Sequence, residues 1–343
     1  MPESQDSEVQ NNETEAPESG TSVFENRLDV SPVKRAADLV RGELHKVIIG
    51  QDKMLDQLLA ALFCGGHVLV EGVPGIAKTL TAKLLAQSLK LDFSRIQFTP
   101  DLMPSDVVGT NVFNLKDSEF HFNRGPVFSN IVLIDEINRA PAKTQAALFE
   151  VMEEYQVTVD GETYQMDFPF FVIATQNPIE QEGTYKLPEA QLDRFIFKII
   201  IDYPDLEEEK QILRRFKSDF TLAQKSTVNP VLSAHEIQQC RQIVEQVFIR
   251  EELLDYIAAI VHNSRNNGDL FLGASPRASL AILKASKAMA AMRGRDFVTP
   301  DDIQEVAFPV LNHRVILTPE REMEGYETAE VINDMVRKVE VPR

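Results

Sequence analysis

The segment "HVLVEGVPGIAKTLTAKLLAQSL", residues 67–89, decides how this chain folds. Its first six residues are mostly apolar and end in glycine, which predicts a strand that is buried on both faces. The residues from Leu80 onward predict a helix, because apolar side chains recur there at helical spacing. Between them lies "GVPGIAKT", a loop that passes from a strand directly into a helix. This arrangement is typical of a phosphate-binding loop.

The chemistry of such a loop depends on its backbone, one lysine and one hydroxyl. Backbone N–H groups at a helix N-terminus point toward phosphate oxygens, and the Lys78 ammonium is expected to reach the terminal phosphates. The Thr79 hydroxyl suits Mg²⁺. Ala77 stands where the usual pattern has a second glycine, and its single methyl is tolerable because the chain is already entering the helix. We expect these residues to contact the nucleotide: Gly72, Val73, Pro74, Gly75, Ile76, Ala77, Lys78, Thr79 and Leu80.

Two further buried strands end in polar residues that suit nucleotide hydrolysis. "IVLIDE", residues 131–136, ends in Asp135, which suits Mg²⁺ binding, and in Glu136, which suits polarising the attacking water. "FFVIATQNP", residues 170–178, contains Asn177, whose amide can orient water and sense the terminal phosphate. An Asn before Pro is more often turn chemistry. Open parallel sheets bind ligands at the carboxyl ends of their strands, so the functional role is favoured here.

The remaining patterns predict an α/β fold followed by helices. A fourth buried strand, residues 195–201, and the helix-like segments between strands indicate a parallel sheet with helices on both faces. After Pro204 only helices are predicted, several of which begin with capping signals. We therefore divide the chain into an acidic disordered tail, residues 1–28, a nucleotide-binding α/β domain, residues 29–204, and a small all-helical lid domain, residues 205–343.

Two segments inside the α/β region interrupt this pattern and predict β-hairpins. "GTNVFNLKDSEFHFNRG", residues 109–125, alternates apolar and polar side chains around a turn. "YQVTVDGETYQM", residues 155–166, does so around Asp160-Gly161, a strong hairpin dipeptide. The hairpins are either surface ribbons without a role or part of an interaction surface.

Composition limits the classes of partner. The chain has 343 residues, 43% of them apolar, and a net charge of −18, which argues against a nucleic-acid partner. No apolar run is long enough for a membrane span, and the acidic N-terminus is unlike a secretory signal. We therefore expect a cytoplasmic protein. Cys64 and Cys240 match no metal spacing and are expected to be buried thiols in a reducing compartment.

Four motifs together resemble the MoxR branch of the AAA+ ATPases, and the likeness runs from about residue 30 to residue 335. They are "GVPGIAKT", "VLIDEINRAP", "VIATQNP" and "EGTYKLPEAQLDRF". In this branch the phosphate-binding loop commonly has the sequence G-x-P-G-x-A-K-T, which accounts for Ala77. Lys186, in contrast, stands where the family pattern has proline. The resemblance implies a P-loop ATPase that uses ATP and Mg²⁺. It also implies a homo-oligomer, a ring of six subunits with each ATP held between neighbours.

The resemblance also implies roles for residues that carry no signal of their own. Arg194 of "LDRF" resembles an arginine finger donated to the γ-phosphate of the adjoining subunit, and Arg277 of "GASPRAS" resembles sensor 2 on the helical lid. Arg139 is a further candidate for the same interface. Ile49 and Gly50 of "VIIGQ" resemble the pocket for adenine. Without the family, single arginines are usually structural ion-pair residues.

The expected function is ATP-driven, chaperone-like remodelling of a protein client, as the resemblance to MoxR relatives with von Willebrand A-domain partners implies. The two hairpins correspond to inserts that face the pore in related rings. A chelatase motor subunit has a similar plan and is the first alternative. A nucleic-acid helicase is the second, although residues 155–166 contain no lysine or arginine to follow a phosphate backbone. A nucleotide-controlled scaffold without turnover is disfavoured by the intact Lys78, Asp135, Glu136 and Arg194.

Overall fold

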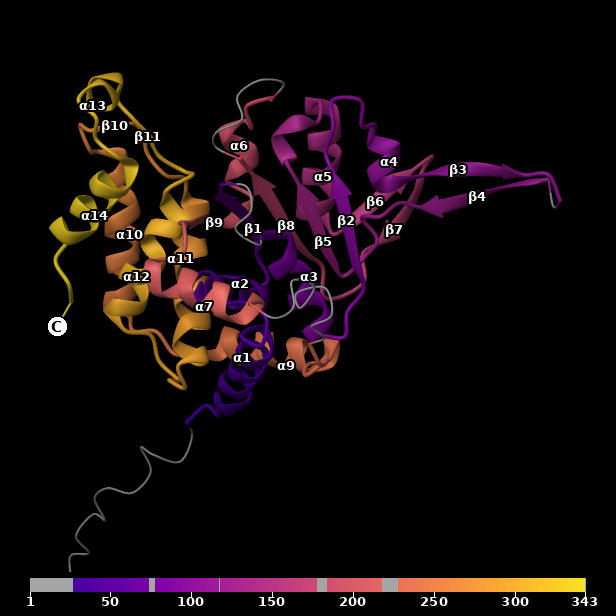
Figure 1. Ribbon diagram of the computed structural model, residues 1–343. Helices are drawn as coiled ribbons and strands as arrows, with labels where there is room; N and C mark the ends of the chain where they lie inside the picture. Colours follow the sequence, from indigo (N-terminus) through magenta and orange to yellow (C-terminus); the bar gives the residue numbers. More distant parts are fainter. Residues whose placement is uncertain (1–26, 74–77, 117, 178–183, 218–227, 343) are drawn as a thin grey trace, which may run out of the picture.

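The computed structural model describes most of the chain (Figure 1). The described residues are 27–73, 78–116, 118–177, 184–217 and 228–342. Four residues of the predicted phosphate-binding loop lie outside these ranges, and so does nearly all of the predicted acidic tail. The four loop residues are Pro74, Gly75, Ile76 and Ala77.

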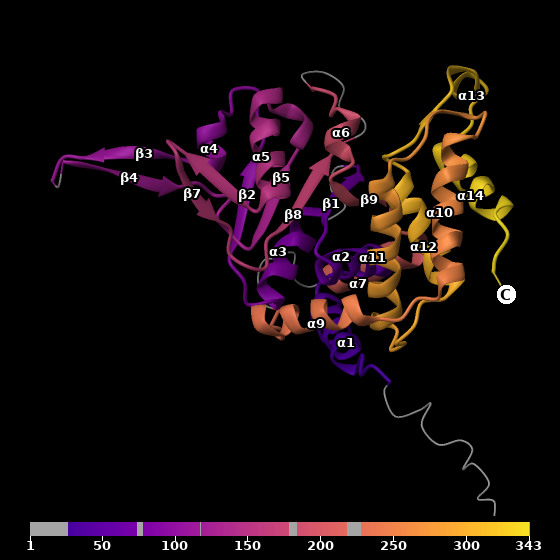
Figure 2. The same ribbon diagram turned by 180° about the vertical axis from the view of Figure 1, so that it is seen from behind.

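A five-stranded parallel sheet forms the centre of the α/β region (Figures 1 and 2). Its strands are β1 (His67–Gly72), β2 (Phe93–Gln97), β5 (Ile131–Asp135), β8 (Phe171–Gln176) and β9 (Phe195–Ile201). In space the order is β2-β5-β8-β1-β9. The sequence predicts four of these strands but not β2. As an edge strand, β2 buries only Ile96, so it lacks the apolar run that marks the central strands.

Helices cover both faces of the sheet, as predicted. Alternate residues of the central strands enter two different apolar clusters: Val68 and Val70 join one, and Leu69 joins the other. The first face packs against α1 (Ser31–Leu44), α2 (Asp52–Cys64) and α3 (Lys78–Ser88). The second packs against α5 (Ala142–Glu154), close to α4 (Pro104–Val108), the 3₁₀ turn η1 (Ile137–Arg139) and the short helix α6 (Glu189–Leu192). Each fully buried Leu or Phe in these clusters contributes about 1.5–3 kcal/mol.

Both predicted hairpins are present. The first consists of β3 (Gly109–Asn114) and β4 (Glu119–Arg124), and it projects far from the body of the molecule (Figure 1). The second consists of β6 (Gln156–Val159) and β7 (Glu162–Gln165). The turn between β6 and β7 places Asp160 and Gly161 at positive φ, as the Asp-Gly dipeptide predicts.

The chain after Pro204 is mainly helical. Its helices are α7 (Leu206–Phe216), α9 (Ala234–Gln246), α10 (Glu251–Arg265), α11 (Pro276–Met292), α12 (Pro300–Leu311), α13 (Pro319–Met323) and α14 (Thr328–Lys338). The expectation of helices alone is wrong in one detail, because β10 (Leu270–Leu272) and β11 (Ile316–Leu317) form a small antiparallel ribbon. These strands are too short to show a period of two in the sequence.

One apolar cluster connects the two halves of the chain. It joins α1 and α2 of the N-terminal half to α9, α11 and α12 of the C-terminal half (Figure 2). Small side chains on α11, including Ala281, Ala285 and Ala288, are buried in this cluster. The N-terminal helices therefore pack against the helical region, and the domain boundary near Pro204 stays a prediction.

Candidate functional site

Three neighbouring strands bring the predicted phosphate site together at the carboxyl edge of the sheet. Because β1, β8 and β5 are adjacent and parallel, their ends at Gly72, Gln176 and Asp135 lie at the same edge. Lys78 begins α3 at this edge. Its Nζ donates to the carbonyl oxygen of Gly72 at 2.6 Å and to that of Gln176 at 3.4 Å. The Lys78 ammonium thus lies between the ends of β1 and β8.

At this edge, the Asp135 carboxylate contacts three other side chains. The Thr79 hydroxyl lies 3.4 Å from both carboxylate oxygens, and the Thr175 hydroxyl donates to Oδ1 at 3.1 Å. Arg95 of β2 donates to Oδ2 at 2.6 Å. A buried carboxylate beside a threonine hydroxyl is the oxygen donor set that Mg²⁺ uses together with phosphate oxygens, so Thr79 and Asp135 fit this ion. Sequence reasoning missed Arg95, because it lies on the one central-sheet strand that was not predicted.

Glu136 has a strained backbone, and its carboxylate is fixed by contacts with two other side chains. Its φ is 57°, a left-handed conformation that is uncommon outside glycine, and its backbone N–H donates to the Thr175 hydroxyl at 3.1 Å. The carboxylate Oε2 accepts from Gln97 Nε2 and from Arg139 Nε, both at 2.9 Å. Arg139 therefore lies at the carboxyl edge, away from Arg194. Gln97, like Arg95, was missed with β2.

The other residues assigned to the nucleotide occupy the surroundings of this edge. Asn177 directly follows β8 and is buried. The side chains of Val73 and Leu80 pack partly buried against the apolar core, so their backbones are what they can offer a phosphate. Each of these three residues thus lies near the end of a strand or the start of α3.

The segment assigned to adenine is fixed by α7. Gly50 has a φ of 65°, a conformation that favours glycine, and the Glu208 carboxylate of α7 lies directly against its Cα. About two turns further along the same face of α7, Arg215 donates to the carbonyl oxygen of Val47 at 2.9 Å. α7 therefore lies directly over the Ile49–Gly50 segment.

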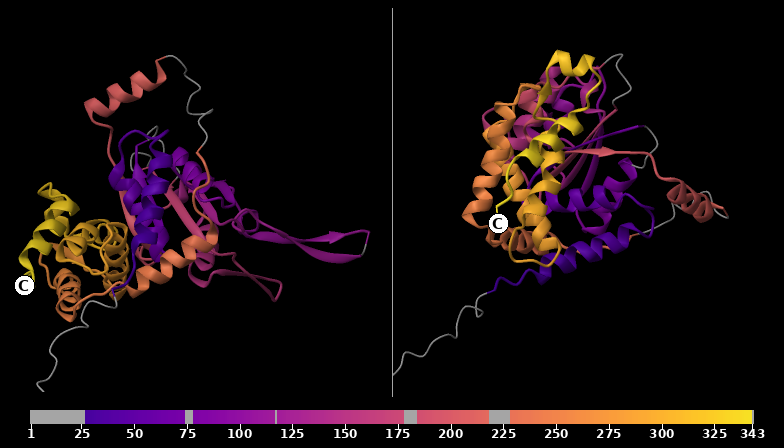
Figure 3. Two further views of the ribbon diagram at one scale, coloured as in Figure 1. Left: turned by 90° about the horizontal axis from the view of Figure 1, so that it is seen from below. Right: turned by 90° about the vertical axis from the view of Figure 1, so that its left-hand side faces the viewer.

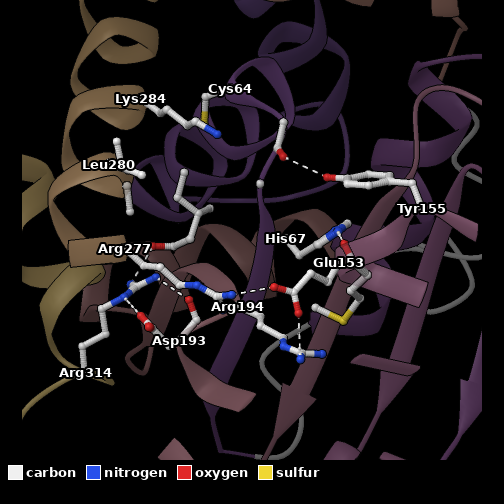
Figure 4. A pocket seen from close by; sticks show the side chains of 15 residues that line it. Cys64, His67, Glu153, Tyr155, Asp193, Arg194, Arg277, Leu280, Lys284 and Arg314 are labelled. Atoms are coloured by element: carbon white, nitrogen blue, oxygen red, sulfur yellow. Dashed lines mark hydrogen bonds and ion pairs between the residues drawn. The ribbon is translucent and has the colours of Figure 1, made fainter. Parts of the chain in front are cut away.

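The two remaining candidate arginines lie at the opposite edge of the sheet. Arg194 immediately precedes β9, whose first residue pairs with His67 at the start of β1. Arg277 is at the start of α11. Both guanidinium groups contact one carboxylate, that of Glu153, at 2.7 Å from Arg194 and 2.5 Å from Arg277 (Figure 4). They line a cavity of about 280 Å³, which we call the arginine pocket.

The length of β1 separates this pocket from Lys78. The strand runs from His67 at the arginine pocket to Gly72 at the phosphate edge, a span of about 17 Å at roughly 3.3 Å per residue. An arginine side chain cannot cover this distance. The structure therefore does not bring Arg194 and Arg277 to the phosphate edge of their own chain.

Arg314 holds the Arg194 segment in place, and the sequence gives no sign of it. Its side chain is buried and pairs with Asp193 at 2.7 Å, and it also donates to the carbonyl oxygen of Phe195 at 2.6 Å. The Ser275 hydroxyl donates to the other oxygen of Asp193 at 2.7 Å. Burial lowers the pKa of Arg314, and the Asp193 carboxylate opposes this shift. Asp193, the residue before Arg194, is thus held by Ser275 at the start of α11 and by Arg314 just after the end of α12.

Cys64 and Cys240 are free thiols, as expected. Burial raises the pKa of each to about 11, so both are neutral near pH 7. Within the described ranges, no group of three or more His, Cys, Asp or Glu side chains could hold a metal ion. Of the helices in these same ranges, none has both the length and the apolar character needed to cross a membrane.

Family models match both halves of the chain. Residues 67–197 match the model described as "ATPase family associated with various cellular activities (AAA)", and residues 262–335 match the AAA lid domain. The first range contains the whole carboxyl edge described above and also Arg194. The second contains Arg277 and Arg314.

Individual proteins and a solved structure are similar over most of the chain. The chaperone MoxR1 of Mycobacterium tuberculosis is 44% identical over 310 residues, which cover 88% of this chain and 81% of that protein. The uncharacterized protein YeaC of Bacillus subtilis is 46% identical over 303 residues, which cover 87% and 92%. A crystal structure from Cytophaga hutchinsonii shares 44% identity with a TM-score of 0.84, covering 92% of this chain and 97% of that one. This chain therefore belongs to the MoxR family of AAA+ ATPases.

Proposed function

We propose that this protein is an ATP-hydrolysing motor that remodels protein clients, and that each ATP is shared by two copies of the chain. The separation of Lys78 from Arg194 and Arg277 supports the sharing most directly. Each copy carries a phosphate-binding edge and, about 17 Å away, a pair of arginines that point at no phosphate of their own chain. A head-to-tail assembly that closes into a ring completes both halves. We propose six subunits.

Within one copy, the carboxyl edge binds the nucleotide. Lys78 neutralises the terminal phosphates, and Thr79 and Asp135 hold Mg²⁺, which supplies charge neutralisation on the phosphate oxygens when bound. Glu136 accepts a proton from the attacking water, because its carboxylate is held at the end of β5 by Gln97 and Arg139. Asn177 orients that water, and the Ile49–Gly50 segment receives the adenine.

The neighbouring copy supplies the cations that act on the transition state. Arg194 donates to the γ-phosphate across the interface, and Arg277 binds beside it. Glu153 holds both guanidinium groups side by side, so they are aligned before a phosphate arrives. Because Asp193 and Arg314 connect Arg194 to α11 and α12, a movement of Arg194 on hydrolysis passes into the helical region.

The β3–β4 hairpin supports a protein client rather than a nucleic acid. Its outer part exposes four apolar side chains, namely Val112, Phe113, Leu115 and Phe120, and the last two are 86% and 70% exposed. Phe113 and Phe120 face each other across the strands, with ring centroids 5.1 Å apart. Exposed apolar patches of this kind are typical of protein-binding surfaces. A von Willebrand A-domain partner and a cytoplasmic location are further parts of this proposal.

Replacing Lys78 with alanine is expected to weaken ATP binding by about 10- to 100-fold, because a partly buried, charge-assisted contact to phosphate is lost. The measurement is an equilibrium titration with a fluorescent ATP analogue in the presence of Mg²⁺. Lys83→Ala on the exposed face of α3 is the matched control and should bind as the unaltered protein does. Equal affinity for the Lys78→Ala and Lys83→Ala variants would remove the phosphate loop from the proposal.

Replacing both Leu115 and Phe120 with serine is expected to leave basal ATP turnover unchanged and to reduce its stimulation by an unfolded protein. Loss of two exposed apolar contacts should weaken binding of the unfolded protein by about tenfold. Turnover would be measured against rising concentrations of permanently unfolded carboxymethylated α-lactalbumin. Asn123→Ser on the same hairpin is the control. Undiminished stimulation would show that the hairpin does not bind the client.

A further inference from the structure

A second cavity, of about 330 Å³, lies beside the arginine pocket and has no part in the chemistry proposed so far. The end of α2, together with α9 and α11, encloses it, and Cys64, Gly65 and Lys284 line both cavities. Figure 4 shows Lys284 and Cys64 at one side of the arginine pocket, and both residues also line the second cavity. We call this second cavity the basic pocket.

Three cations line the basic pocket: Arg241, Lys284 and Lys287. Arg241 donates through Nε to the carbonyl oxygen of Leu62 at 2.9 Å, while one of its terminal nitrogens is buried without a hydrogen-bond partner in the described structure. Lys287 donates to the carbonyl oxygen of Glu245 at 2.8 Å. None of the three forms an ion pair with a carboxylate in the part of the chain described here. The Glu245 carboxylate also lines the pocket, and Arg241 lies over the Phe168 ring, so the three cations still outnumber the one carboxylate. This excess of positive charge suits the pocket to an acidic ligand.

The floor of the basic pocket is apolar. Phe63, Val244 and Leu283 line it beneath the cations. A fitting ligand therefore combines carboxylates with an apolar side chain. Free inorganic anions meet only half of this requirement.

One segment of the same chain has this combination. Residues 202–209, "DYPDLEEE", carry five carboxylates and no cation. Tyr203 and Leu206 within it are 71% and 67% exposed. Asp205 and Glu208 form a capping box that fixes the start of α7, so the segment is presented in a defined shape. It cannot reach its own basic pocket, because α7 and α9 lie on opposite sides of the body (Figure 3, left).

A head-to-tail neighbour would bring the segment to the basic pocket. On the nucleotide-binding side, α7 lies over the Ile49–Gly50 segment, beside the proposed adenine site. On the receiving side, Lys284 follows Arg277 by seven residues along α11, about 10 Å at 1.5 Å per residue. In the proposed shared ATP site the phosphates of one copy lie against Arg277 of the next, which would place α7 of the first copy and the two lysines of α11 of the second at the same interface.

We propose that the basic pocket of each copy receives the acidic segment 202–209 of the neighbouring copy. Tyr203 or Leu206 enters over the apolar floor, and the carboxylates around Leu206 pair with the lysines of α11. This contact rests on the proposed shared ATP site and adds to it a second point of attachment, on the adenine side of the interface. The basic pocket of one copy would thus bind specifically to the start of α7 in a neighbouring copy of the same chain.

Charge reversal tests the contact directly. In the Glu136→Gln background, where ATP persists, Lys284→Glu with Lys287→Glu is expected to weaken assembly about tenfold or more, and so is Glu207→Lys with Glu209→Lys. Combining all four reversals should restore assembly to within about threefold of the unreversed protein. Assembly is measured by size-exclusion chromatography with light scattering, across a concentration series with ATP and Mg²⁺.

Matched controls separate this contact from general effects of charge. Glu251→Lys with Glu252→Lys reverses two exposed acids in the first turn of α10, and it should neither weaken assembly nor rescue the lysine reversals. The inference is overturned if the protein with all four reversals assembles no better than the proteins with two. It is also overturned if either pair of reversals has no effect on assembly. Binding of a fluorescent ATP analogue is measured on every variant. If the unreversed protein binds no ATP, the proposed function fails; if it binds ATP and assembles regardless of these charges, only this inference fails.

Discussion

Replacing Arg194 with alanine is expected to lower ATP turnover of the assembled protein by about 10³ to 10⁵, the range for an arginine that acts in trans on a phosphoryl transition state. ATP binding to the same variant should stay close to its original affinity, because Arg194 lies at the amino edge of the sheet and Lys78 at the carboxyl edge. Steady-state phosphate release and nucleotide titration measure the two effects separately. Arg194→Lys should not restore the rate, since an ammonium lacks the planar fork of a guanidinium.

Mixing two inactive proteins tests whether Arg194 acts on its neighbour. Lys78→Ala subunits lack the phosphate loop but keep Arg194, and Arg194→Ala subunits have the opposite defect. A mixed assembly contains some interfaces where an intact loop meets an intact arginine, so turnover should reappear on mixing. Arg321→Ala on α13, which removes ion pairs with Asp269 and Glu324 and a stacking contact with Tyr326, is a control that should leave turnover unchanged. If the mixture stays inactive although the subunits co-assemble, Arg194 does not act across the interface.

Replacing Glu136 with glutamine is expected to reduce turnover by about 10² to 10⁴, the usual contribution of a positioned general base, while ATP remains bound. Glutamine keeps the size of the side chain and can still contact Gln97, but its amide cannot accept a proton from water. Single-turnover hydrolysis and a binding titration on the same preparation give both quantities. The strained backbone at Glu136 is unaffected, because glutamine has the same main-chain requirements as glutamate.

A matched substitution guards this second prediction against a nonspecific effect of charge removal. Glu150→Gln removes an exposed carboxylate from α5 on the same half of the molecule and should hydrolyse ATP normally. Normal hydrolysis by Glu136→Gln as well would exclude Glu136 as the base. Loss of binding together with hydrolysis would instead show that Glu136 supports the nucleotide rather than the chemistry.

The carboxyl edge of the sheet is the part of the site that sequence predicts well. Asp135 and Asn177 follow buried apolar strands, and Lys78 starts a helix after another, so strand order alone brings them together. Other element ends also coincide with residue types that mark ends locally: Gly65 follows α2 in a left-handed conformation, and the Ser233 side chain caps α9. Each of these signals is local, with strand, turn and helix read from a few neighbouring residues.

The residues that sequence reasoning missed depend on long-range contacts. Arg95 and Gln97 lie on an edge strand whose alternation is weak, and their role appears only when β2 pairs with β5. Glu153 and Arg314 are single charged residues in helical surroundings, where most such side chains face water. Their partners are 41 and 121 residues away in the chain, so no spacing rule can find them.

The carboxylate of Glu153 has a consequence for a copy that is alone in solution. Because its one negative charge pairs with both Arg194 and Arg277, it halves the net positive charge that the two guanidinium groups of a solitary subunit present to cellular phosphates or to acidic proteins. In the proposed assembly, the triphosphate bound to a partner copy, with its higher charge, would compete with Glu153 for the two arginines. Specific activity would then rise with protein concentration, and dilution alone would switch the enzyme off.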